Sequence, residues 1–167
     1  MISSNEIEKF LGEHAKIFNA IREHGAVFFI RSDNSNRITV DSSSRYDRGH
    51  VYYDIMYNEF DFTCCGEISA SSDYLFLNVK EAFTKYLELI EENGYMPDGI
   101  DRHFYYDDRT LWKTCRPKFL DFIRQKIEEM PDASGRDGQE VMEKTLREIY
   151  DFSLSLRSQA IENDQSN

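Results

Sequence analysis

Two short stretches, Ala26-Val27-Phe28-Phe29-Ile30 (residues 26–30) and Arg37-Ile38-Thr39-Val40 (residues 37–40), decide the fold class of this chain. The first is a continuous apolar run, and the second returns with β-branched residues, as strands do. The residues between them, Asp33-Asn34-Ser35-Asn36, are typical of a turn. We therefore predict a β-hairpin at residues 26–40.

A second pair of strands is expected after residues 42–49, a polar, glycine-ended segment that is typical of an exposed loop. Apolar and polar residues alternate on both sides of a turn at Asn58-Glu59, which is the two-residue period of a strand. One face of the first strand would carry Val51, Tyr53, Ile55 and Tyr57. On the returning strand, Phe60, Phe62 and Cys64 alternate with Asp61, Thr63 and Cys65. Residues 74–77 fit either a further strand or a lead into the next helix.

Apolar residues at helical spacing predict helices on both sides of the strands. A capping box at Ser3 and a left-handed stop at Gly25 predict a helix at residues 4–24. An amphipathic stripe predicts a second helix at residues 80–93. Pro117 suits the first turn of a helix at residues 117–130, and a last helix is expected at 139–161. Residues 103–107 are expected as a short strand, 132–138 as a linker and 162–167 as a flexible tail.

A helix, then strands, then helices is the order typical of an α+β fold. We expect a mainly antiparallel sheet of about 4–6 strands packed against helices, with an N-terminal helix and two C-terminal helices. The length of 167 residues suits a single domain over residues 1–161.

Composition excludes several functional classes. The formal net charge of −11 argues against direct binding of nucleic acid, since that affinity comes from Lys and Arg that displace counterions. Anionic membrane surfaces are disfavoured for the same reason, and no window approaches the roughly 18 apolar residues of a membrane span. The start of the chain has no basic or apolar leader, so we expect a cytoplasmic protein. Cys64, Cys65 and Cys115 are then expected as buried, reduced thiols.

One constellation would suit catalysis. On an extended strand, Asp101, His103 and Asp107 would line one face and could hold a divalent metal with a bound water as nucleophile. This alternative makes the protein a small metal-assisted hydrolase. The other reading of these residues is a solvated strand end, and the common nucleotide, zinc and calcium motifs are absent from the sequence. We expect no catalytic residue, metal or other cofactor.

The acidic and aromatic residues favour binding of another protein instead. The chain has 10 Tyr and 12 Phe, and Tyr is a favoured anchor at interfaces because it combines an apolar body with a polar tip. Carboxylates around such anchors would steer a basic partner. The predicted partner-binding residues are Asp54, Tyr57, Glu59, Asp61, Glu67, Asp98, Asp101, Tyr105, Asp107 and Asp108. The alternative reading is an ordinary solvated face, with the tyrosines filling the sheet under the helices.

In general character the chain resembles the small acidic immunity proteins of bacterial toxin systems: one α+β domain, an aromatic-rich sheet and no catalytic signature. The resemblance implies a non-catalytic inhibitor that binds a basic toxin domain, often a nuclease, either over its active site or on a neighbouring surface. A further alternative is a nucleic-acid mimic whose carboxylates imitate phosphates. The sequence leaves open whether the protein is a monomer or a homodimer, because residues 142–160 would either pack on the domain or form a coiled-coil-like seam.

Overall fold

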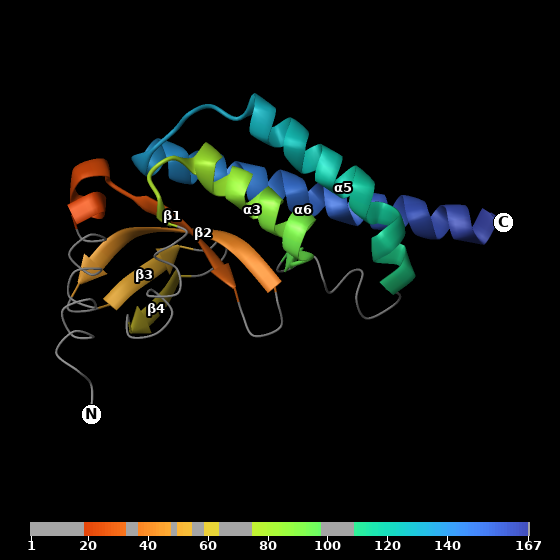
Figure 1. Cartoon of the computed structure of the whole chain (residues 1–167), viewed down its shortest axis with the longest axis horizontal. Coiled ribbons are helices and arrows are strands. Elements are labelled where there is room, and N and C mark those ends of the chain that lie inside the picture. Colours follow the sequence, from red (N-terminus) through yellow and green to blue (C-terminus); the bar gives the residue numbers. More distant parts are fainter. Residues whose placement is uncertain are drawn as a thin grey trace.

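The computed structural model describes residues 19–32, 37–47, 50–54, 59–63, 75–97 and 109–166 (Figure 1). Residues 19–24 are helical. The other elements, in chain order, are β1 (Val27–Ser32), β2 (Arg37–Asp47), β3 (His50–Asp54), β4 (Glu59–Thr63), β5 (Leu75–Phe76), α3 (Val79–Asn93), β6 (Met96–Pro97), α5 (Arg109–Glu129) and α6 (Gly135–Ser166). The strand expected at 103–107 and the expected helix before residue 19 lie outside the described residues.

The strands form one sheet in the order β4-β3-β2-β1-β5, and β6 pairs with β2 off this path. The hairpin predicted from residues 26–40 is the antiparallel pair β1–β2, in which Ile30 lies opposite Val40. The pairs β2–β3, β3–β4 and β1–β5 are antiparallel as well, whereas β6 runs parallel to β2. The sheet is therefore mixed, and the expectation of a mainly antiparallel sheet missed the parallel strand.

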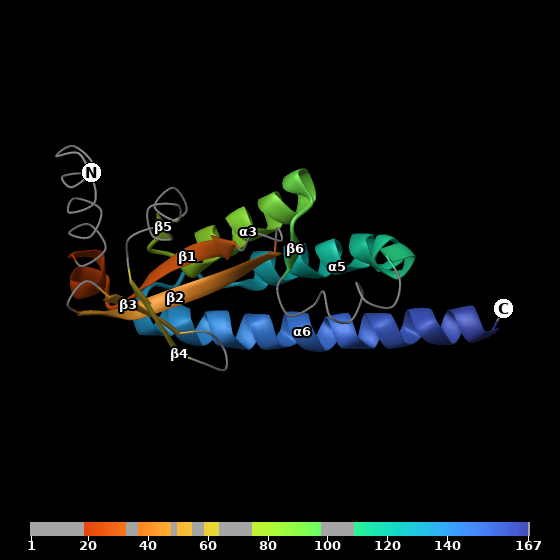
Figure 2. The same cartoon turned by 90° about the horizontal axis from the view of Figure 1, so that it is seen from below.

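The helices gather on one face of the β1–β2 hairpin. Helix α3 contacts β1 and β2, α6 contacts β2, and α5 packs against both α3 and α6 (Figures 1 and 2). The predicted α+β class is confirmed. The C-terminal end of α6 extends beyond α5 in both views.

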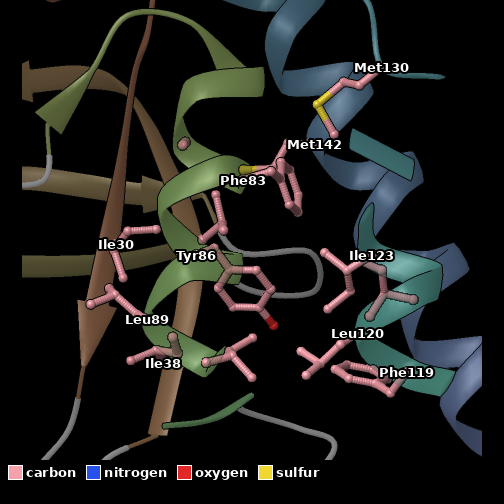
Figure 3. Close-up of a cluster of buried hydrophobic side chains, with 14 of the residues drawn as sticks. Ile30, Ile38, Phe83, Tyr86, Leu89, Phe119, Leu120, Ile123, Met130 and Met142 are labelled. Atoms are coloured by element: carbon pink, nitrogen blue, oxygen red, sulfur yellow. The ribbon is translucent and has the colours of Figure 1, made fainter. Parts of the chain in front are cut away.

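The core lies between the sheet and these helices (Figure 3). Ile30 and Ile38 of the sheet lie on one side of α3, and Leu120 and Ile123 of α5 lie on the other, with Tyr86 of α3 in between. Each fully buried aliphatic or aromatic side chain contributes about 1.5–3 kcal/mol relative to an exposed one. The core side chains with almost no exposed surface are Phe28, Ile38, Val40, Phe83, Ile90, Phe119, Ile123, Met142 and Ile149.

Helix α3 confirms the helix predicted at 80–93, and its two ends explain its length. The Asn78 side chain caps the start and accepts hydrogen bonds from the backbone N–H groups of Lys80 (2.8 Å) and Glu81 (3.4 Å). Gly94 ends the helix in the left-handed conformation, with φ at 68°. Arg116 of α5 donates to the last carbonyls of the helix, those of Ile90 (3.0 Å) and Glu91 (3.2 Å). A cation thus satisfies the carbonyl end of α3, whose last turn holds no basic residue.

The helix expected at 117–130 begins eight residues earlier, so Pro117 lies inside α5 instead of at its first turn. A proline in a helix interior costs about 3 kcal/mol, because its ring removes one hydrogen bond and crowds the preceding turn. The residues before it offset that cost by packing. Cys115 is buried, and Trp112 makes an edge-to-face contact with Phe119, with ring centroids 5.4 Å apart. The apolar contacts of the first two turns of α5 therefore outweigh the tendency of Pro117 to start a helix at its own position.

The last helix is also longer than the expected 139–161. It begins at Gly135, inside the expected linker 132–138, and runs to Ser166, through the expected flexible tail. The residues before it are held to α3: the backbone N–H of Val79 donates to Ala133 (2.9 Å), and Asn78 forms a β-bridge with Ser134. Glycine at position 138 allows α6 to lie close to the sheet. A Cβ on Gly138 would lie 2.6 Å from the Phe28 ring and 3.0 Å from the carbonyl oxygen of Ala133.

The apolar stripe of α6 is used inside the domain. Met142, Ile149, Ser153 and Leu156 are buried, and Leu146 and Ala160 pack against the core. The Phe152 ring stacks on Phe122 of α5 with centroids 4.0 Å apart, and the Lys126–Glu148 ion pair (2.8 Å) joins the same two helices. Of the two readings of this stripe, packing on the domain is the one that the structure supports.

The loop expected at 42–49 is mostly strand, because β2 continues to Asp47. Ser42 and Ser43 are fully buried, and the side-chain amide of Gln139 on α6 donates to the Ser42 hydroxyl (3.1 Å). A polar sequence is thus accommodated in the sheet by side-chain hydrogen bonding to the helix above it. The pairing with β3 shifts register between Ser42 and Arg45, which is a β-bulge.

Replacing Gly138 with alanine tests the close approach of α6 to the sheet. Helix propensity alone predicts that Gly138→Ala stabilises the protein by about 1 kcal/mol. We expect the opposite sign, a loss of about 1–3 kcal/mol, because the new methyl group overlaps the buried Phe28 ring. Urea denaturation measures the difference. In the double variant Phe28→Leu/Gly138→Ala the two costs should be less than additive, and a Gly138→Ala protein more stable than the parent would contradict the packing described.

The reactivity of Cys115 tests the burial of α5. Its side chain is 2% exposed, and burial raises the pKa of the thiol, an effect that the charge of Lys118 only partly offsets. The thiolate is the reactive form, so alkylation of Cys115 by iodoacetamide near pH 8 should be at least about tenfold slower in the native protein than in urea. Mass spectrometry of the Cys115 peptide follows the reaction. Equal rates with and without urea would show that the start of α5 is not packed as described.

Candidate partner-binding surface

The β3–β4 hairpin has two chemically different faces. Directly paired residues share a face of an antiparallel ladder, and here Asp54 pairs with Glu59 and Tyr52 pairs with Asp61. The alternate pairs are Val51 with Phe62 and Tyr53 with Phe60. The alternation predicted for residues 51–53 and 60–62 is therefore confirmed in the register. The turn expected at Asn58-Glu59 is wrong at Glu59, which belongs to β4 and pairs with Asp54, and Ile55 and Tyr57 lie outside the described residues. We call the face that holds Asp54, Glu59 and Asp61 the acidic ribbon.

The register also relates the acidic ribbon to the rest of the fold. Phe28 of β1 pairs with Ser42 of β2, and Ser42 pairs with Asp54. Ser42 receives the hydrogen bond from Gln139 of α6, so the acidic ribbon lies on the sheet face that the helices cover. The helices contact chiefly β1 and β2, however, and β3 and β4 lie at the end of the sheet away from α3 and α5 (Figures 1 and 2). The acidic ribbon therefore continues the helix-covered face beyond α3 and α5.

The register pairs two acidic residues, Asp54 and Glu59, across the ladder. Like charges at such positions destabilise a ladder, by up to about 1 kcal/mol. Acidic residues on an outer strand also discourage sheet-to-sheet aggregation, which is the structural explanation for them. Binding of a cationic partner is the functional explanation, because it would relieve the repulsion within the pair.

The first turns of α6 carry charges of both signs near the hydrogen bond from Gln139 to Ser42. Asp137 and Glu140 are exposed, and so is Arg136.

Two residues of this region were not predicted as site residues. Tyr52 lies opposite Asp61 on β4 and opposite Arg45 on β2, and the alternation of the strand contained the signal, since Tyr52 is two residues from Asp54. Asp41 on β2 is fully buried. Burial of a carboxylate in an apolar interior costs free energy. The sequence did not predict this burial, because Asp41 directly precedes the polar segment 42–49 that was expected as an exposed loop.

Of the ten predicted partner-binding residues, the structure brings together Asp54, Glu59 and Asp61. The remaining positions lie outside the described residues, and so does His103 of the alternative metal site. Those positions are Tyr57, Glu67, Asp98, Asp101, Tyr105, Asp107 and Asp108.

The described part of the chain also bears on metal sites, thiols and membrane-spanning helices. No group of three His, Cys, Asp or Glu side chains within it is arranged to hold a metal ion. Cys115 confirms the expectation of a buried free thiol, whereas Cys64 and Cys65 lie outside the described ranges. Among the helices described, none is both long and apolar enough to span a bilayer.

No protein-family model, no curated protein and no solved structure matches the chain.

Proposed function

We propose that the protein is a non-catalytic inhibitor that binds a basic partner protein through its acidic ribbon. The observation that carries the proposal is the register that places Asp54, Glu59 and Asp61 on one face of the hairpin at the end of the sheet. The resemblance in character to bacterial immunity proteins supplies the partner class, a cationic toxin domain of the nuclease kind, met in the cytoplasm.

Electrostatics supports this assignment of roles. A net charge of −11 gives the whole chain a field that attracts a cationic domain, and the acidic ribbon supplies a local target. Carboxylates at an interface mainly accelerate association and select the partner. We assign the role of aromatic anchor to Tyr52, which pairs with Asp61 in the ladder.

The other predicted residues extend the proposal to the segments outside the described structure. Tyr57 lies three residues after the end of β3, and Glu67 lies four residues after the end of β4 in the chain. Asp98, Asp101, Tyr105, Asp107 and Asp108 form a second acidic and aromatic stretch of sequence between β6 and α5. We assign all of them a supporting role in partner binding.

Reversal of charge on the acidic ribbon tests the proposal. The partner is first captured at low salt from lysate of the native host and identified by mass spectrometry. We expect Glu59→Lys/Asp61→Lys to slow its association by about tenfold to a hundredfold at low salt, and to weaken the salt dependence of the rate. Stopped-flow measurement of the association rate is the readout, and inhibition of the partner's activity is the second readout.

The matched control is Glu128→Lys/Asp151→Lys, which changes the net charge equally but at exposed positions of α5 and α6. Its association rate should stay within about threefold of the parent value, as expected for charges outside the interface. An unchanged rate in the ribbon variant, or equal slowing in both variants, would contradict the proposal. Capture of a nucleic-acid-binding protein with no toxic activity would instead identify a nucleic-acid mimic.

A further inference from the structure

Strand β4 is one of the two terminal strands of the sheet and the longer of them. It spans Glu59–Thr63, and within the described residues it pairs with β3 alone, whereas β5 at the other end spans only Leu75–Phe76. The outer side of a terminal strand presents a row of backbone N–H and C=O groups that can pair with one more strand. β4, which also holds Glu59 and Asp61, is therefore the terminal strand at which a partner could add backbone hydrogen bonds to the electrostatic attraction.

The residues of β4 select what can pair there. Glu59, Asp61 and Thr63 share one face, and Phe60 and Phe62 share the other. In a strand paired with β4, successive residues would lie opposite an acidic residue and a phenylalanine in turn. Basic residues suit the positions opposite Glu59 and Asp61, and apolar residues suit those opposite Phe60 and Phe62.

A second copy of this chain is a poor occupant. Two antiparallel β4 strands paired about Asp61 would place Asp61 opposite Asp61, and a shift of the pairing to bring Glu59 opposite Asp61 also places like charges together. An extended segment in which Lys or Arg alternates with apolar residues would place opposite charges together in the same registers, so it avoids this repulsion.

We propose that the partner adds an extended basic segment to the outer side of β4, as a further strand of the sheet. This inference rests on the proposed function and specifies its mode: backbone pairing gives affinity, and alternation of basic and apolar side chains gives specificity. The face of β4 that holds Glu59 and Asp61 would receive the basic residues of the added strand. The face that holds Phe60 and Phe62 would receive its apolar residues.

Short synthetic peptides, about as long as β4, test the mode on the full chain without the natural partner. The probe alternates lysine with valine, one control has the same composition with its lysines and valines in separate blocks, and a second control alternates glutamate with valine. Amide hydrogen exchange of Phe60, Asp61 and Phe62, measured by NMR with and without peptide, is the readout. We expect the alternating basic peptide to slow exchange of the outward-facing amides by about tenfold or more, and both controls to leave them unchanged.

The variant Glu59→Lys/Asp61→Lys provides the reciprocal test. It should lose the protection given by the lysine–valine peptide and gain protection from the glutamate–valine peptide, because the backbone edge is retained and only the charge is reversed. Circular dichroism and urea denaturation establish that the variant is folded.

Three results would overturn strand addition. In the first, the outward-facing β4 amides of the free chain are already as protected as those of β1, so another part of the chain covers the edge. In the second, the block peptide protects β4 as well as the alternating one does. In the third, no peptide protects β4 up to its solubility limit. If charge reversal still slows association of the captured partner in that last case, the proposed function stands and only its mode is wrong.

Discussion

The close approach of α6 to the β1–β2 hairpin is the contact on which the rest of the structure depends. It is possible because residue 138 is glycine, which leaves room for the Phe28 ring. The next residue, Gln139, hydrogen-bonds to Ser42, and Ser42 is the residue of β2 that pairs with Asp54. One contact between helix and sheet therefore determines both the packing of the core and the position of the acidic ribbon.

The proposal of a binding role for the acidic ribbon starts from its register. Asp54 is paired with Glu59, and stability alone would favour an opposite charge at one of two paired positions. Elsewhere the chain does use such pairs: Lys126 with Glu148 and Arg124 with Glu91 each join two helices. On the hairpin, by contrast, the register pairs two acidic residues, Asp54 and Glu59, and this contrast is one basis of our proposal of a cationic partner.

Periodic segments could be predicted from the sequence, and segments decided by distant contacts could not. The alternation around Tyr53 and Phe60 gave the faces of β3 and β4, and the stripe around Phe83 gave α3 with both ends. Pro117 and the glycines at 135 and 138 were misleading, because a proline or glycine usually interrupts a helix. Burial of Cys115 and the approach of Phe28 decide those positions, and neither contact is visible in a local pattern.

The candidate site likewise has a part that local periodicity predicts and a part that depends on distant contacts. Asp54, Glu59 and Asp61 could be grouped from the strand period, and Tyr52 could have been added by the same rule. The position of the acidic ribbon on the face that α6 covers could not, because it is shown by the hydrogen bond between Gln139 and Ser42, residues 97 apart in the chain.

A hydrogen-exchange footprint of the complex with the captured partner would test the central claim most directly. The account predicts that protection on binding is concentrated in β3 and β4, residues 50–54 and 59–63, with a smaller effect at the start of α6. Protection confined to α3 or to the exposed side of α5, with β3 and β4 unchanged, would contradict it.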